Sequence, residues 1–176
     1  MTVSWSAIHN LHALDAAEHF ARSRALGLEC PPDVFEQLFH DNPGNEAFAS
    51  AVGSIDWANV LWEETMLSGA ALQRVAVPRT YQHAVDEARW RTLQGGVQDS
   101  RPQIIEHWRI AGTWLRSPIL VAGEVMGSPV GSECVVGFTR LGNLFGLLDR
   151  QELSGAVPHR VWLGRQHFAR HAAPNW

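Results

Sequence analysis

The chain has 176 residues, of which 45% are hydrophobic and 18% are charged, a balance typical of a folded globular protein. The formal net charge of −4 lacks the clustered Lys and Arg that a broad nucleic-acid surface needs, so direct DNA binding is not expected. The sequence has no apolar run of about eighteen residues and no basic and apolar leader at its start. We therefore expect a cytoplasmic protein without a membrane span.

Three short amphipathic helices are predicted in the first part of the chain. Apolar spacing and capping residues place them over 10–26, from Pro31 to Asp41 and from Asn45 to Val52. Helices of this length are marginally stable alone, so each needs a surface to cover. We expect residues 1–54 to form a helical extension that packs on a main domain of residues 55–176.

The main domain alternates predicted strands and helices. Apolar runs indicate strands over 60–67, 119–122, 133–136 and 160–163. Helices are predicted from Thr80 to Gly95, from Pro102 to about Ser117 and from Leu141 to about Arg150, with proline in a first turn and glycine at an end. The tail from Gln166 to Trp176 is predicted to begin as a short helix.

The stretch VVGFTRLGNL, residues 135–144, combines a strand end, a glycine and the start of a helix. The first amides of a helix lack intrahelical partners and lie at the positive end of its dipole, so this junction can hold a phosphate. Arg140 would add a charged fork. The alternative is that Gly137 only reverses the chain, Thr139 is an N-cap, and Arg140 pairs with a surface carboxylate.

Histidine and cysteine spacing predicts no metal site. The nine histidines include two pairs at helical spacing, His9 with His12 and His167 with His171. Neither pair has the Glu of an HExxH motif or a nearby cysteine set. Cys30 and Cys134 lie far apart and form no CxxC motif, which indicates two packed thiols.

Two adjacent carboxylates, Glu63 and Glu64, occupy a predicted strand. Neighbouring side chains of a strand point to opposite faces, so these two cannot act together as an acid–base dyad. Glu64 is the candidate cleft carboxylate, and the alternative is a solvated strand surface. The sequence shows no GxSxG motif and no Walker loop, so it does not decide whether the protein is an enzyme.

From about Ile55 to Arg165, the order of elements resembles the ParB/sulfiredoxin-like superfamily, also called ParB-like nucleases. Ser117-Pro118-Ile119-Leu120-Val121 resembles the Pro-Ile strand of that superfamily, and Gly137-Phe138-Thr139-Arg140-Leu141-Gly142 resembles its phosphate-holding loop. The resemblance implies an α+β fold in which helices flank a small mixed sheet. It also implies a phosphate or nucleotide site, whose candidate residues are Gly137, Phe138, Thr139, Arg140, Gly142 and Asn143.

The loop also departs from the superfamily pattern. Val136 and Phe138 stand where family members often carry an acidic residue or histidine, and the loop has no cysteine of the sulfiredoxin kind. We therefore expect a nucleotide- or phosphate-binding protein, either an NTPase or a nucleotide-gated switch, with a nucleoside triphosphate and Mg²⁺ as the candidate ligands. The alternative is a non-catalytic protein–protein interaction module that uses the N-terminal helices and exposed tryptophans.

Overall fold

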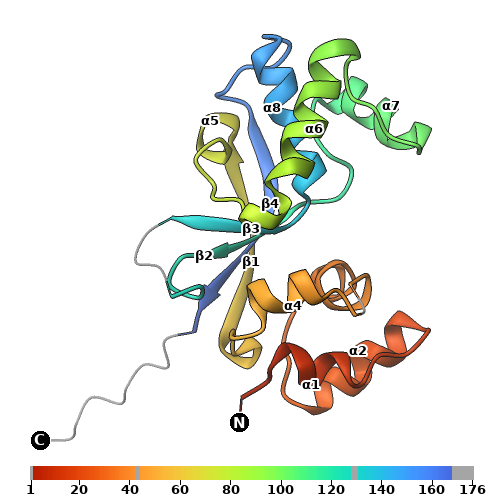
Figure 1. Cartoon of the computed structure of the whole chain (residues 1–176), viewed down its shortest axis with the longest axis vertical. Coiled ribbons are helices and arrows are strands. Elements are labelled where there is room, and N and C mark those ends of the chain that lie inside the picture. The colour runs from red at the N-terminus through yellow and green to blue at the C-terminus, as the bar shows by residue number, and fades with distance from the viewer. Residues whose placement is uncertain (1, 43, 128–130, 168–176) are drawn as a thin grey trace, which may run out of the picture.

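A four-stranded mixed sheet forms the centre of the computed structural model, which describes residues 2–42, 44–127 and 131–167 (Figure 1). The strands are β1 (Val60–Ser68), β2 (Ile119–Ala122), β3 (Ser132–Val136) and β4 (Pro158–Gln166). Their order is β1-β4-β2-β3, in which β4 runs antiparallel to β1 and parallel to β2, and β2 runs antiparallel to β3. The expected α+β class with a small mixed sheet is therefore confirmed.

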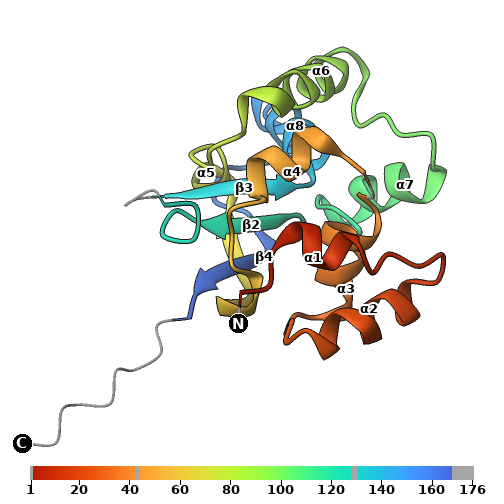
Figure 2. The same ribbon diagram turned by 60° about the horizontal axis from the view of Figure 1, so that its bottom comes forward.

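Helices cover both faces of this sheet (Figures 1 and 2). One face carries the N-terminal elements α1 (Trp5–His9), α2 (Ala16–Ala25), α3 (Pro32–Phe35), the π-helical turn η1 (Glu36–His40) and α4 (Glu46–Val52). A 3-10 turn, η2 (Trp57–Asn59), leads into β1. The other face carries α5 (Gly69–Leu72), α6 (Arg79–Gly95), α7 (Pro102–Ala111) and α8 (Phe138–Asp149).

The alternation of side chains along β2 explains why the sheet sits between two helical layers. Ile119 and Val121 belong to the hydrophobic core under the N-terminal helices, whereas Leu120 and Ala122 belong to the core under α6 and α8. All four side chains are buried, as expected for a strand covered on both faces.

The N-terminal helices contribute a large part of the first core. Their buried side chains include two aromatic pairs, Trp5 with Phe48 and Trp5 with Phe39, whose ring centroids lie 4.8 and 5.7 Å apart. The same core continues through Trp57 and Val60 into the sheet. The extension therefore shares its core with the sheet, and the boundary between residues 54 and 55 stays a prediction.

Most helix boundaries follow local signals in the sequence. Asn45 caps α4, because its side chain accepts a hydrogen bond from the amide of Phe48 at 3.1 Å. Pro102 occupies the first turn of α7, and Gly96, with φ of 82°, closes α6.

The predicted helix over 10–26 is wrong in its first third. A separate helix, α1, begins after Ser4, and α2 begins only at Ala16 with Asp15 as its cap. Leu14, which the apolar spacing assigned to a buried face, is fully exposed. A capping residue inside the periodic segment therefore outweighed the apolar periodicity. At the other end of the chain, β4 reaches Gln166, and the predicted tail helix falls mainly on residues 168–176, outside those described.

Neither cysteine is linked to another residue; Cys134 is buried and Cys30 is half-buried. Burial raises the pKa of Cys30 to about 12 and that of Cys134 to about 12. Both groups are therefore protonated at neutral pH and poor nucleophiles. Among the described residues, no helix is both long enough and apolar enough to cross a membrane.

Two glycines let α6 and α8 pack unusually close together. A Cβ at Gly142 would lie 2.4 Å from the carbonyl oxygen of Val85 and 2.7 Å from the Cβ of Ala88. A Cβ at Gly146, one turn later, would lie 2.6 Å from the Cβ of Thr92. The absence of side chains at these two positions therefore allows the short distance between the two helices.

We predict that Gly142→Ala destabilises the protein. Alanine gains about 1 kcal/mol of helix propensity, but overpacking a well-filled site costs about 1–3 kcal/mol, and the cost lies at the upper end here because a backbone carbonyl must move. The expected net loss is about 1–2 kcal/mol in the free energy of unfolding, measured by urea denaturation. The control is Gly155→Ala, whose new Cβ would meet Ala70 at an ordinary 3.5 Å. Equal stability of the two variants would contradict the packing argument.

Candidate functional site

The predicted strand–glycine–helix junction is confirmed. β3 ends at Val136, and Gly137 is the N-cap of α8 in the left-handed conformation, with φ of 103°. A Cβ at Gly137 would lie 2.7 Å from the Cβ of Pro118, so glycine is required for two reasons. No side chain caps α8, so Thr139 is not the N-cap that the alternative interpretation assumed. The positive end of the α8 dipole is therefore left without a capping group.

The Arg140 side chain folds back over this helix start. Its Nη1 donates to Oε1 of Gln37 at 2.8 Å and to the carbonyl oxygen of Ser117 at 3.1 Å. Desolvation by burial is the main cause that lowers the pKa of the guanidinium, and the positive charges of Arg116 and Arg101 act in the same direction. An arginine nevertheless stays charged in a protein. The ion pairs found in the described part of the chain do not include Arg140.

A cavity of about 260 Å³ opens beside the first turn of α8, and we refer to it as the Arg140 cavity. Its basic and polar lining consists of Arg101, Arg116, Arg140, Gln103, Thr139 and Asn143. Its apolar lining consists of Ile104, Trp108, Trp114 and Leu115. Asp41 is the carboxylate in the lining. The cavity thus combines a cationic side with an apolar side.

The three arginines of the cavity differ in how their charges are balanced. Arg101 pairs with Asp99 at 2.9 Å. The guanidinium of Arg116 lies within an acidic group, at 2.6 Å from Asp33, 3.0 Å from Glu36 and 3.8 Å from Asp41. Arg140 instead has two neutral oxygen partners. Among these three arginines, Arg140 is therefore the one that forms no ion pair with a carboxylate.

Two residues of the predicted phosphate loop serve helix packing instead. The ring of Phe138 stacks on Tyr81, with centroids 4.3 Å apart and planes at 6°. Gly142 faces the backbone of α6 at Val85, as described above. The side chain of Phe138 and the absence of a side chain at Gly142 both contribute to the contact between α6 and α8.

The remaining polar residues of the loop do reach the cavity. Thr139 is exposed and lines it, and Asn143 lines it from the next turn of α8. Oδ1 of Asn143 accepts a hydrogen bond from Oγ1 of Thr92 at 3.0 Å, which fixes the orientation of the amide. Thr139, Arg140 and Asn143 are therefore the residues of the prediction that the structure brings together around one space.

The candidate cleft carboxylate, Glu64, lies on the exposed surface of β1. One of its carboxylate oxygens is 3.7 Å from the guanidinium of Arg160, and its side chain is 43% exposed. The neighbouring Glu63 pairs with Arg165 at 2.9 Å in the same way. The alternative interpretation of a solvated strand surface is the correct one, because both carboxylates pair with arginines of the adjacent strand β4.

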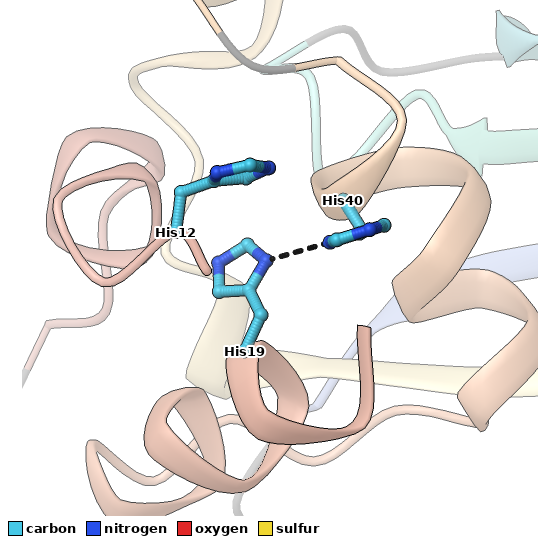
Figure 3. A group of neighbouring side chains, drawn as sticks. All are labelled: His12, His19 and His40. Atoms are coloured by element: carbon cyan, nitrogen blue, oxygen red, sulfur yellow. Dashed lines mark hydrogen bonds between the residues drawn. The ribbon is translucent and has the colours of Figure 1, made fainter. Parts of the chain in front are cut away.

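A second group of polar side chains lies in the N-terminal extension, away from this loop. His12 lies between α1 and α2, His19 lies in α2, and His40 is the last residue of η1 (Figure 3). One ring nitrogen of each lies within 4.8 Å of those of the other two. His19 is fully buried, and the other two are half-buried. We call these three residues the histidine cluster.

The hydrogen bonds of His19 fix the state of its ring. Nε2 lies 3.1 Å from the carbonyl oxygen of Ile8, and a carbonyl only accepts, so Nε2 carries the proton. Nδ1 lies 3.4 Å from Nδ1 of His40. Desolvation by burial lowers the pKa of His19, and the rings of His12 and His40 act in the same direction, so the ring is neutral at neutral pH. Nδ1 of His19 therefore presents a lone pair to the cluster.

Sequence reasoning found Thr139, Arg140 and Asn143 but missed the residues that tertiary packing brings to them, and it missed the histidine cluster. Gln37, Arg101 and Arg116 approach Arg140 from segments far away in the chain, and nothing in their spacing indicates it. The expectation of no metal site considered His12 only with His9. His19 and His40 join it because α2 packs against η1.

Comparisons with known proteins assign no family to the chain. Protein-family models, curated proteins and solved structures all gave no significant match.

We predict that Arg140→Ala lowers the stability of the protein. Truncation removes the donor to Oε1 of Gln37 and leaves a void, and the loss of a partner from a buried polar group costs about 1–3 kcal/mol. The free energy of unfolding should fall by that amount in a urea titration. The control is Arg91→Ala, which removes an exposed i,i+4 pair with Glu87 and should change stability by less than about 0.5 kcal/mol. An Arg140→Ala protein as stable as the control would show that the two hydrogen bonds do not stabilise the fold.

Proposed function

We propose that this protein binds a small phosphate-bearing ligand, such as a nucleotide, in the Arg140 cavity. One observation carries the proposal: the guanidinium of Arg140 is half-buried and desolvated at an uncapped helix start, and no side-chain carboxylate pairs with it in the described residues. Buried charges in proteins are ordinarily paired or bound to a ligand of opposite charge. An anion is the group that would pair this charge.

Electrostatics favours an anion at this position from two sides. The backbone amides at the start of α8 contribute a partial positive charge, and the guanidinium adds a full one over the same turn. The helix start and the guanidinium are both positive, so they repel one another. A negative group bound beside both would offset this repulsion. A phosphate supplies several acceptor oxygens and matches the fork of an arginine.

The size of the cavity limits the ligand. Its volume of about 260 Å³ lies just below the roughly 300–1,000 Å³ of ordinary small-molecule sites. The space suits a phosphate group with a small attached group, and the apolar side formed by Trp108 and Leu115 can contact a sugar or part of a base. A whole dinucleotide would extend beyond it.

The resemblance to the ParB/sulfiredoxin-like superfamily supports the same ligand class, because that superfamily holds nucleotide phosphates at the corresponding loop. Cys134, which lies on β3 three residues before Gly137, is a buried and protonated thiol and therefore a poor nucleophile. Asp41 is the carboxylate of the lining that could approach a Mg²⁺ ion carried by a nucleoside triphosphate.

The alternative function, a protein interaction module, is favoured by one observation. Trp90 and Leu93 are 61% and 38% exposed on α6, which forms part of the outer surface. The N-terminal helices offer less for this purpose, because Trp5, Phe35 and Phe39 are buried in the core. An interaction that depends on Trp90, with no anion binding, would favour this second function.

We predict that Arg101→Gln weakens anion binding while the fold is kept. Arg101 is exposed and lines the cavity, so its loss removes a charge without disturbing the contacts of Arg140. A charge-assisted hydrogen bond is worth about 1.5–3 kcal/mol, and partial exposure reduces this, so we expect about a tenfold loss of affinity. Isothermal titration calorimetry with phosphate, pyrophosphate and nucleoside mono-, di- and triphosphates, with and without Mg²⁺, measures it.

A matched control comes from α7, the helix that Arg101 precedes. Arg109 pairs with Glu106 on α7 but lines a different cavity, so Arg109→Gln should bind as wild type does. Wild-type protein at a ligand concentration of about 100 times Kd should gain about 2.7 kcal/mol of stability. Absence of binding by every phosphate compound, or equal loss in both variants, would refute the proposed site.

A further inference from the structure

We propose that the histidine cluster, His12, His19 and His40, is a binding site for a divalent transition-metal ion, with Zn²⁺ as the preferred ion. The site is separate from the Arg140 cavity and does not depend on the proposed ligand. The three rings converge from a loop, from α2 and from η1: Nδ1 of His19 faces Nδ1 of His40, and the His12 ring stacks on that of His40 with centroids 5.1 Å apart (Figure 3).

The spacing of the nitrogens fits tetrahedral coordination. Zn–N bonds of about 2.0–2.1 Å at tetrahedral angles place neighbouring ligand nitrogens about 3.3 Å apart. The Nδ1 atoms of His19 and His40 are 3.4 Å apart. The third nitrogen, from His12, completes a set within 4.8 Å. The His12 ring is stacked on that of His40, with planes at 14°, so it must rotate to direct this nitrogen at the ion, and its place in the loop between α1 and α2 leaves it outside a helical backbone.

The surroundings of His19 are those of a metal ligand. Metal-bound histidines ordinarily donate the other ring N–H to a backbone carbonyl or a carboxylate, which fixes the tautomer and orients the ring. His19 does so through Nε2 to the carbonyl of Ile8. The edge of Phe35 packs against the same ring, with centroids 4.8 Å apart, and holds it in place. The nitrogen that points at the cluster is therefore oriented before any ion binds.

The backbone conformation at His40 is also typical of a functional site. η1 is a π-helical turn, closed by the amide of Asp41 donating to the carbonyl of Glu36 at 2.8 Å. Such turns are rare and are frequent at functional sites, because the extra residue changes where the following side chains point. The side chain of Asn42 satisfies carbonyls of this turn, at 2.8 Å from that of Gln37, so the irregular backbone is held in place.

The donor set selects the class of ion. Three neutral imidazoles suit Zn²⁺ and its neighbours Co²⁺, Ni²⁺ and Cu²⁺, whereas Mg²⁺ and Ca²⁺ prefer oxygen ligands. Three protein ligands leave a fourth position for water or another ligand. The half-buried His12 and His40 leave a route from solvent to the centre. Nδ1 of His9, next to His12, is buried without a hydrogen-bond partner in the described residues, so the neighbourhood also holds an unused polar group.

A bound ion would join three segments of the extension that are otherwise held by apolar packing and by the hydrogen bonds of His19. We therefore expect one equivalent of Zn²⁺ to bind metal-free, tag-free protein and to raise its melting temperature. Co²⁺ should give the intense visible absorption of tetrahedral coordination, which reports on ligand geometry independently of stability. Calorimetric titration and Co²⁺ absorption are measured on the full chain.

Variants at different histidines test whether Zn²⁺ binds at the histidine cluster or elsewhere. His12→Ala and His40→Ala should each weaken Zn²⁺ binding by more than about 100-fold, since even the loss of a partner outside the coordination shell typically costs 10–100-fold. His83→Ala, an exposed position on α6, should bind as wild type does, and so should the double variant His167→Ala/His171→Ala. Circular dichroism establishes that each variant is folded. No saturable Zn²⁺ binding by wild type, or binding unchanged in both His12→Ala and His40→Ala, would overturn the proposal, and neither result bears on phosphate binding.

Discussion

The hydrogen bonds of Arg140 to Gln37 and Ser117 join the three layers of the molecule. Gln37 belongs to the N-terminal extension, Ser117 lies just before the central strand β2, and Arg140 begins α8 on the other face of the sheet. The amide of Gln37 also donates to the carbonyl oxygen of Ser117 at 3.1 Å. Because the guanidinium is desolvated, it needs these oxygens, and the extension cannot move away without leaving it unsatisfied.

A network of polar contacts extends this connection to the rest of the sheet. Asp33, at the start of the extension's third helix, accepts from Gln37 at 3.0 Å, from Arg116 at 2.6 Å and from the indole of Trp162 on β4 at 2.9 Å. One turn of the chain, η1, thus carries Gln37 for the Arg140 cavity and His40 for the histidine cluster. A ligand that fixes either side chain would restrict the same π-helical turn, so the two candidate sites share a structural element although the proposed ligands differ.

The sequence was most informative where the physical cause is local. Asn45, Pro102 and Gly96 determine helix ends through their own backbone and side-chain chemistry, and those ends were predicted. The junction at Gly137 was also predicted, because a strand, a glycine and a helical apolar period follow one another there. The contact of Gly142 with α6 was not predicted, because the sequence pattern of a glycine in a phosphate loop does not differ from that of a glycine at a close helix crossing.

The contacts that complete both candidate sites could not be predicted from the sequence, because they are made by tertiary packing. Arg140 meets Gln37 across 103 positions, and His19 meets His40 across 21. No periodicity in the chain connects such positions. A guanidinium with neutral partners also cannot be told from one in a surface ion pair before its neighbours are placed.

The balance of charge around the cavity decides which kind of anion it can hold. Arg116 lies among carboxylates, and Arg101 already pairs with Asp99, so the surroundings form no continuous basic surface. A polyanion such as DNA would be repelled by these carboxylates as well as attracted by the arginines. Its net electrostatic attraction to this surface would therefore be small, in keeping with the net charge of −4. At the proposed site a single phosphate would contact Arg140 and the amides at the start of α8, and the carboxylates around Arg116 and Arg101 would disfavour additional negative groups. The same acidic neighbours that weaken a broad electrostatic attraction therefore favour one small anion over an extended one.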